Sequence, residues 1–149
     1  MTDATETISI VRIFDAPRDL VFQNWVRTED ISTCFAPKGF TVNACEVDAR
    51  PGQRWWVEFR SPTGEVHREF GEFREIKEPE KLIFTLTQQD SHGNTGPQTL
   101  VTVTLAEQGS KTEMTFLQTG YEAATMRDGN AEGWTECFDK LDVHVAARR

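Results

Sequence analysis

His67 and Glu69 are the residues whose type and spacing come nearest to a chemical site. Both lie in residues 66–76, which alternate as a strand does, so their side chains share one face with Gly71 and Phe73. If this face points inward, an imidazole and a carboxylate project into an apolar cavity, where they could pair or anchor a polar group of a ligand. The opposite face also mixes apolar and charged residues. The alternative is therefore that His67 and Glu69 lie at a solvated strand edge and have no role.

Other kinds of site chemistry find no support in the sequence. The three histidines show no metal-ligand spacing, and the three cysteines are widely separated and form no CxxC motif, so we expect buried free thiols and no metal. No GxSxG elbow is found. Residues 93–96 are rich in glycine but lack the lysine and the helix of a phosphate cradle. We expect no cofactor, and no catalytic constellation is visible.

Net charge and composition exclude several classes of partner. The 149 residues include 16 Lys and Arg against 24 Asp and Glu, which gives a net charge of -8. This charge repels nucleic acid and anionic lipid surfaces. The first residues lack the basic and apolar regions of a leader, and no apolar run approaches the ~20 residues that span a bilayer. We expect a single cytoplasmic domain over residues 1–149.

Turn residues divide most of the chain into strand-like segments. Alternation within residues 53–60 places Trp55, Val57 and Phe59 on one face, which we expect to point inward. The turns are too short for parallel crossovers, so an antiparallel meander is the predicted topology. The predicted strands are residues 7–14, 40–48, 53–60, 66–76, 81–88, 98–106 and 111–119.

Three helices are expected around these strands. Pro17 suits the first position of a short helix, and the Thr28 hydroxyl can cap a second one. Asn130 can cap a long C-terminal helix. The apolar stripe of this helix recurs at three- and four-residue intervals and comprises Trp134, Cys137, Phe138, Leu141 and Val145.

The predicted order of elements is one strand, two short helices, six strands and a long helix, which is an α+β fold. A seven-stranded antiparallel sheet that curves around the long helix buries the helix stripe against its concave face. Side chains fill one end of such an arrangement, and the other end can stay hollow. We therefore expect a mostly apolar pocket between the sheet and the C-terminal helix.

Several stretches, in order along nearly the whole chain, resemble a known family. They are 11–17 with Val21, Phe22 and Trp25; 48–52; Gly71, Glu75, Ile76 and 79–82; 101–105 with Lys111 and Thr112; and 133–141. The chain is similar to the START/SRPBCC superfamily of helix-grip proteins, and within it to the branch named after the C-terminal domain of the activator of the heat-shock protein 90 ATPase. It departs from the family pattern at Gln53, where a glycine is usual, and around Cys34-Phe35, where a tryptophan is common.

The resemblance implies a protein that binds a hydrophobic or amphipathic small molecule in the cavity. Two alternatives stay open. One is an enzyme of the cyclase, dehydratase or hydrolase kind, which would need a general acid or base such as His67, Glu69 or Tyr121. The other is a protein-binding regulator, because the branch is named after a co-chaperone. Members of the superfamily can also form homodimers.

The residues expected to line the cavity come from the apolar faces of the predicted elements and from the strand that carries His67. For most of them, simple core packing is the alternative. Trp134 and Phe35 are expected at the mouth, since helix-grip folds open between those elements. The full set is Trp25, Phe35, Trp55, Val57, Phe59, His67, Glu69, Phe73, Phe84, Phe116, Trp134, Phe138 and Leu141.

Overall fold

Seven antiparallel strands form one sheet in the order β1-β7-β6-β5-β4-β3-β2. The computed structural model describes residues 7–148. Each strand from β2 to β7 pairs with the next one in the sequence, which confirms the predicted meander. The last strand, β7, also pairs with β1. The strands are β1 (Ile8–Phe14), β2 (Thr41–Val47), β3 (Arg54–Arg60), β4 (Val66–Lys77), β5 (Lys81–Gln89), β6 (Thr99–Gln108) and β7 (Lys111–Thr119).

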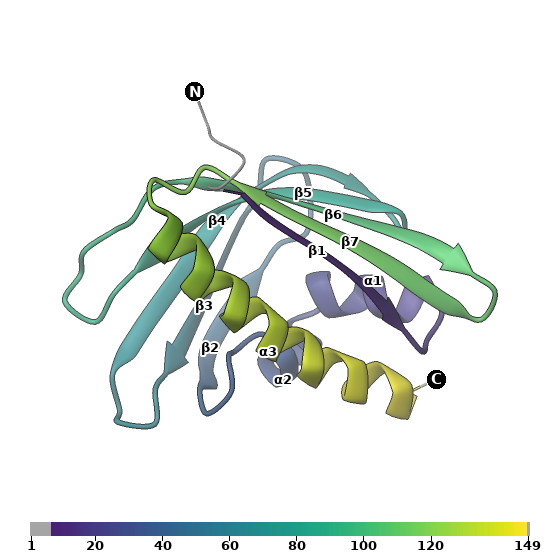
Figure 1. Cartoon of the computed structure of the whole chain (residues 1–149), viewed down its shortest axis with the longest axis horizontal. Coiled ribbons are helices and arrows are strands. Elements are labelled where there is room, and N and C mark those ends of the chain that lie inside the picture. Colours follow the sequence, from purple (N-terminus) through teal and green to yellow (C-terminus); the bar gives the residue numbers. More distant parts are fainter. Residues whose placement is uncertain (1–6, 149) are drawn as a thin grey trace.

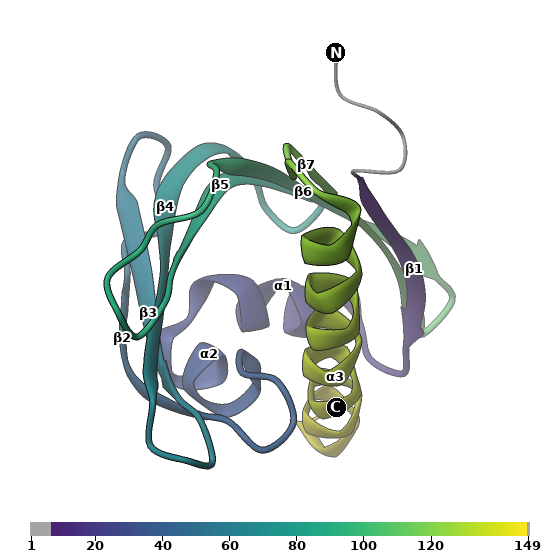
Figure 2. The same ribbon diagram turned by 60° about the vertical axis from the view of Figure 1, so that its left-hand side comes forward.

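The sheet curves around the C-terminal helix α3 (Ala124–Arg148), which runs along its concave side (Figure 1). Figure 2 shows the short helices α1 (Arg18–Val26) and α2 (Thr28–Cys34) inside the same curve. The buried residues of α3 are the predicted stripe, because only that face meets the sheet. The α+β helix-grip architecture is therefore confirmed.

The beginnings of the helices differ from the sequence-based expectation. Pro17 precedes α1, and Thr28 is already the first residue of α2, which has no side-chain cap. Asn130 lies inside α3 and caps nothing. Its Nδ2 donates to the Met126 carbonyl oxygen at 2.8 Å, and its Oδ1 accepts from Gln88 at 2.7 Å. The bond to Met126, four residues earlier, is one that a residue inside a helix makes, and α3 begins at Ala124, before the expected boundary.

The inward face of β4 is settled by its register with β3. Directly opposite residues of an antiparallel pair project from the same face. On β3, Trp55, Val57 and Phe59 are buried, as expected. The register pairs Trp55 with Gly71, Val57 with Glu69, and Phe59 with His67. His67 and Glu69 therefore project into the concave side of the sheet.

Gly71 on β4 lies where the side chain of Trp55 from β3 passes over β4 to reach the backbone of β5. The Trp55 indole Nε1 on β3 reaches across β4 and donates to the Thr85 carbonyl oxygen on β5 at 3.2 Å. A Cβ at position 71 would lie 1.8 Å from that same oxygen. The neighbouring backbone N–H of Glu72 donates to the Thr85 hydroxyl at 3.0 Å. Any side chain at position 71 would force β4 and β5 apart and break the Trp55 hydrogen bond.

Gly71→Ala should therefore destabilise the protein by about 3 kcal/mol or more, because the added methyl overlaps the backbone of β5. Gly129→Ala is the matched control. Position 129 lies in α3, where an added Cβ meets no atom within 4 Å, and alanine there should stabilise the helix by up to about 1 kcal/mol. Urea unfolding measures both changes. A Gly71→Ala variant as stable as the parent would contradict the close approach of β5 to position 71.

Candidate functional site

Aromatic rings fill the middle of the space between the sheet and α3. Trp25 contacts the rings of Phe35, Phe84, Phe116, Trp134 and Phe138, with centroids 5.8 to 6.2 Å apart. The hollows left among these side chains measure about 20 Å³ and about 10 Å³, room for no more than a single water. The interior around Trp25 is therefore packed core.

This packing corrects the predicted extent of the cavity. Eight of the expected lining residues lie in the packed core and away from the large pocket described below. Their apolar side chains are all buried, so they contribute to the packed core and do not line a cavity. They are Trp25, Trp55, Val57, Phe73, Phe84, Phe116, Phe138 and Leu141.

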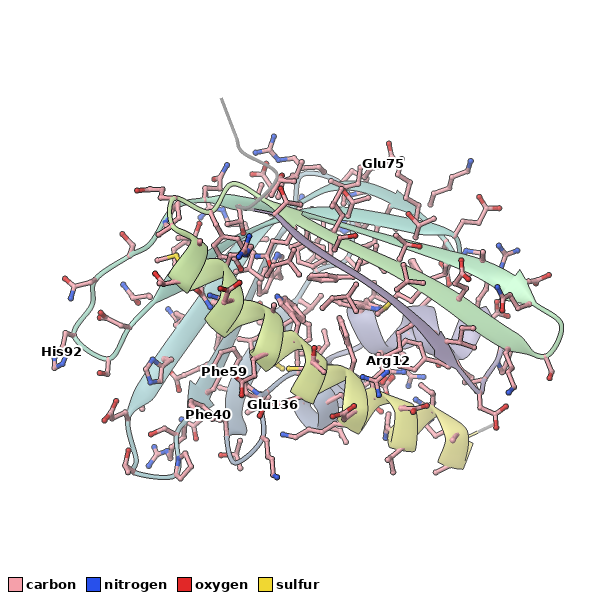
Figure 3. The ribbon with its side chains drawn as sticks, in the orientation of Figure 1. Arg12, Phe40, Phe59, Glu75, His92 and Glu136 are labelled. Carbon is pink, nitrogen blue, oxygen red and sulfur yellow. The ribbon has the colours of Figure 1, made fainter. Side chains whose placement is uncertain are left out.

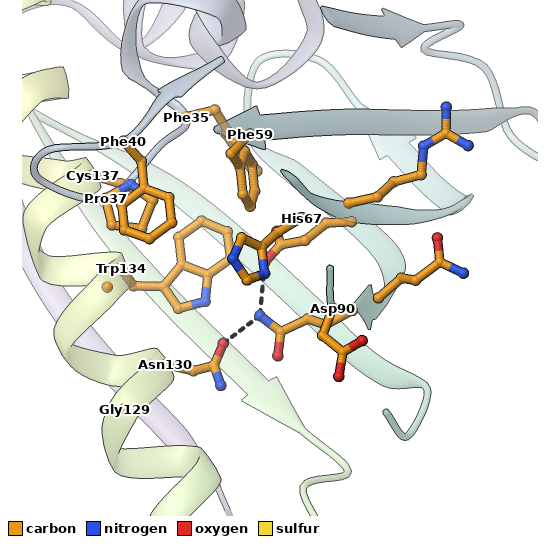
Figure 4. Close-up of a pocket in the computed structure, with 15 residues that line it drawn as sticks. Phe35, Pro37, Phe40, Phe59, His67, Asp90, Gly129, Asn130, Trp134 and Cys137 are labelled. Atoms are coloured by element: carbon orange, nitrogen blue, oxygen red, sulfur yellow. Dashed lines mark hydrogen bonds between the residues drawn. The ribbon is translucent and has the colours of Figure 1, made fainter. Parts of the chain in front are cut away.

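A pocket of about 300 Å³ opens at one end of the sheet, beside the first half of α3 (Figure 4). Five of the expected residues line it: Phe35, Phe59, His67, Glu69 and Trp134. The remaining lining residues are Pro37, Phe40, Arg68, Gln88, Gln89, Asp90, Gly129, Asn130, Gly133 and Cys137. Figure 3 shows Phe40 and Phe59 on the side of the sheet that faces α3.

Several polar lining residues were missed, although the sequence carried a signal for them. Gln88 follows Phe84 and Leu86 at two-residue spacing on β5, so strand alternation places it on the same inward face. Asn130 lies four residues before Trp134 on α3, which is the spacing of one helix face. The expectation that Asn130 caps the helix hid its position on this face, and Gln88, although inside the predicted strand 81–88, was not among the expected lining residues.

The loop of residues 35–40, between α2 and β2, forms one wall of the pocket and is fastened to α3. Lys140 Nζ donates to the carbonyl oxygens of Pro37, at 3.1 Å, and Phe40, at 3.5 Å. The backbone N–H of Lys38 donates to Glu136 Oε1 at 3.3 Å. These bonds hold the Phe40 ring at the pocket while the loop itself has no regular structure.

A chain of buried hydrogen bonds orients Trp134, the aromatic floor of the pocket. Its indole Nε1 donates to Gln118 Oε1 at 2.8 Å, and Gln118 Nε2 donates to Thr99 Oγ1 at 2.8 Å. The Thr99 hydroxyl then donates to the Leu86 carbonyl oxygen at 2.7 Å. Because each donor in this chain has one defined acceptor, the ring has one orientation.

Glu69, Gln88 and Asn130 form the polar end of the pocket. Gln88 Nε2 donates to Glu69 Oε2 at 2.8 Å and to Asn130 Oδ1 at 2.7 Å. Within residues 7–148, Glu69 Oε1 accepts no hydrogen bond. Burial raises the pKa of Glu69 to about 7, and the hydrogen bond from Gln88 acts in the opposite direction. A carboxyl that changes charge near neutral pH therefore stands at the end of an aromatic pocket.

Three neighbours complete the surroundings of Glu69. His67 Nε2 lies 3.8 Å from Glu65 Oε2 and is not paired with Glu69 within the described chain. The Tyr121 hydroxyl is buried and has no hydrogen-bond partner in residues 7–148. Burial, and then the nearby Glu69 charge, raise the pKa of both Tyr121 and Cys137, which keeps the phenol and the thiol protonated.

No group of three or more His, Cys, Asp or Glu side chains gathers within residues 7–148 in a way that could hold a metal ion. No helix among them is long and apolar enough to cross a membrane. All three cysteines are free thiols.

Residues 15–146 match the family model described as Activator of Hsp90 ATPase homolog 1-like protein. The chain belongs to this family. No curated protein matches the chain significantly. Solved structures match its fold over nearly the whole length. A Chromobacterium violaceum protein has a TM-score of 0.86 and 24% identity, covering 94% of this chain and 96% of its own.

Two further similar structures come from other bacteria. An AHSA1 protein of Silicibacter pomeroyi has a TM-score of 0.86 and 18% identity, covering 96% of this chain and 99% of its own. A protein of Arthrobacter aurescens has a TM-score of 0.84 and 24% identity, with coverage of 99% and 91%. At these identities the likeness shows a shared fold and nothing more.

Glu69→Gln should improve the stability of the protein increasingly as pH rises. The folded-state pKa of Glu69, about 7, exceeds the ordinary value of 4.5, so the folded protein binds the additional proton between these values. Stability that depends on this proton is lost as pH rises through about 7. Glutamine keeps the shape and never ionises. The variant should gain about 1–2 kcal/mol relative to the parent between about pH 4.5 and pH 8.

Urea unfolding at several pH values measures this difference. Glu75→Gln is the matched control, because Glu75 is half exposed and points away from α3 (Figure 3). Its stability difference from the parent should stay nearly constant with pH. A constant difference for Glu69→Gln as well would show that burial does not perturb the Glu69 carboxyl.

Proposed function

We propose that this protein binds one small hydrophobic or amphipathic molecule in the pocket beside the first half of α3. The observation that carries the proposal is the division of the pocket into two chemically different parts. Aromatic side chains such as Phe35, Phe59 and Trp134 line one part, and Glu69 and Gln88 stand in the other. Apolar walls with a few convergent polar groups are the usual composition of a site for a small organic ligand.

The size of the pocket limits the ligand. A volume of about 300 Å³ lies at the lower end of the range for small-molecule sites. A compact molecule of two or three rings fits this space, and a longer one would extend past the mouth into solvent. Because the core around Trp25 is filled, the ligand cannot pass deeper between the sheet and the helix.

The walls of the pocket are held in place before any ligand arrives. Trp134 is oriented by its bond to Gln118, and the 35–40 loop is fastened by Lys140. A pocket whose walls are already ordered loses little side-chain entropy when it binds. This preorganisation supports a role in ligand binding more than a role in packing alone.

Acid–base catalysis in the same pocket is a second candidate, favoured by one observation. The pKa of Glu69 is about 7, which suits a group that takes and returns a proton near neutral pH. Native mass spectrometry of the parent and of Glu69→Gln, both purified from cells, separates the two functions. A catalyst blocked at Glu69 retains unconverted substrate, so the bound mass should change. The same bound mass in both proteins would favour binding without chemistry.

The neutral fluorophore N-phenyl-1-naphthylamine should bind in the pocket with one site per chain and quench Trp134 by energy transfer. Phe40→Ser removes one aromatic wall, and we expect it to weaken binding about five- to tenfold. Fluorescence titration measures the dissociation constant.

Val11→Ser is the matched control for this experiment. Val11 is 61% exposed on the outer face of β1, far from the pocket, and could attract the probe without any specific site. The substitution should leave the affinity unchanged. If Val11→Ser abolished the signal while Phe40→Ser did not, the probe would be on the outer face and the proposed pocket function would be wrong.

A further inference from the structure

The polar end of the pocket presents acceptors to a ligand. Both N–H groups of the Gln88 amide are already used, one on Glu69 and one on Asn130. One N–H of Asn130 is bound to the Met126 carbonyl oxygen. Glu69 Oε1 is left open within the described chain, and so is the side-chain oxygen Oε1 of Gln88. This arrangement favours a ligand whose polar group donates several hydrogen bonds.

The cations near the pocket are engaged elsewhere. Arg68 belongs to the opposite face of β4 and stacks on the Trp56 ring, with its guanidinium carbon 4.5 Å from the ring centroid. Lys140 is bound to the carbonyl oxygens of Pro37 and Phe40. Neither of them neutralises Glu69. The carboxylate therefore faces the pocket without a cationic partner from residues 7–148.

The remaining groups beside the pocket favour positive charge. Asp90, at the end of β5, adds a second carboxyl, which its own turn holds through the backbone N–H groups of His92 and Asn94. The rings of Phe59 and Trp134 line the same space as Glu69. Aromatic faces attract cations through their quadrupoles. Carboxylates and aromatic faces together suit an ammonium group.

We propose that the ligand of this pocket is an amphipathic amine. Its ammonium group donates to Glu69 Oε1, and its apolar body lies against Trp134 and Phe59. The inference rests on the proposed binding function and names the ligand class of that same pocket. A carboxylic acid of the same shape is disfavoured, because its charge would meet the Glu69 carboxylate.

The affinity for such an amine should depend on pH. Binding requires ionised Glu69, so below about pH 7 each unit should weaken binding by up to about tenfold, since a proton must be displaced. Tyr121 and Cys137 face Glu69 and stay neutral over this range. Asp90 keeps its charge, because hydrogen bonds from its own turn hold its pKa below the usual value. His67 lines the same pocket, and His67→Gln isolates the effect of Glu69.

Three naphthalene compounds of matched shape test the head group: 2-naphthylmethylamine, 2-naphthylmethanol and 2-naphthoate. At about pH 8 the amine is mostly protonated and Glu69 is mostly ionised. Isothermal titration calorimetry should show the amine binding at least about tenfold more tightly than the alcohol, and the carboxylate most weakly of all. Glu69→Gln should remove the advantage of the amine and leave the affinity for the alcohol within about twofold.

Glu65→Gln is the matched control. It removes an equal charge from an exposed residue at the rim, and the amine should keep its advantage there. An alcohol that binds the parent as tightly as the amine would overturn the inference and leave the pocket function standing. Equal losses of amine affinity in Glu65→Gln and Glu69→Gln would also overturn it, because general surface charge would then explain the preference. If neither these compounds nor N-phenyl-1-naphthylamine bound, the proposed function itself would fail.

The pH dependence of amine binding to the parent protein is a second measurement that needs no variant. The amine affinity should rise from about pH 6 to pH 8, while that of the alcohol stays flat. An amine affinity independent of pH over this range would overturn the role of Glu69 even if a substituted protein failed to fold.

Discussion

The apolar stripe of α3 begins at Trp134, ten residues into the helix, and the rest of the structure depends on this offset. From Trp134 to Val145 the helix offers large side chains, and the concave sheet closes on them, leaving hollows of no more than about 20 Å³. Before Trp134 the same face offers Gly129, Asn130 and Gly133, and of these only the Asn130 amide meets the sheet, through the hydrogen bond that it accepts from Gln88. The sheet cannot collapse locally, because its curvature is set by the packed half. A hollow remains where the helix has no large side chains.

Two carboxyl groups at opposite ends of the fold, those of Asp30 and Glu69, have different partners. Asp30 on α2 is bound by His144 Nε2 at 2.9 Å and by Arg148 Nη1 at 2.6 Å, near the end of α3. Glu69 has only the Gln88 amide as a partner. The ion pair with Arg148 at the closed end fastens the helix, whereas the Glu69 carboxyl at the open end has no cationic partner within residues 7–148. Buried charge without a counter-ion destabilises a fold, so its retention beside a pocket is typical of a functional site.

The strands and the helix stripe could be predicted because both depend on local periodicity. Alternation within β3 identified Trp55, Val57 and Phe59 as inward, and the spacing of Trp134 to Val145 identified the buried face of α3. The inward face of β4 could not be read in this way, since polar and apolar residues occur on both of its faces. Only pairing with β3 decides it. Whether His67 and Glu69 touch a ligand stays a prediction.

The extent of the cavity could not be predicted, for a different reason. Alternation tells which side chains point inward, but whether they meet depends on the distance between sheet and helix. Trp25 illustrates this: it comes from α1 and fills the space that the sheet and α3 leave between them. Packing of this kind involves residues far apart in sequence, and no local pattern reports it.

The attachment of the 35–40 loop has a consequence for how this binding surface can diversify. Lys140 holds the loop through the carbonyl oxygens of Pro37 and Phe40, and Glu136 holds it through the N–H of Lys38. Main-chain atoms are present whatever the side chains are. Substitutions at Phe35 or Phe40 can therefore change the shape of the pocket wall without releasing the loop from the helix. Proteins that differ from this chain at Phe35 or Phe40 can therefore prefer other ligands and still keep the same fold.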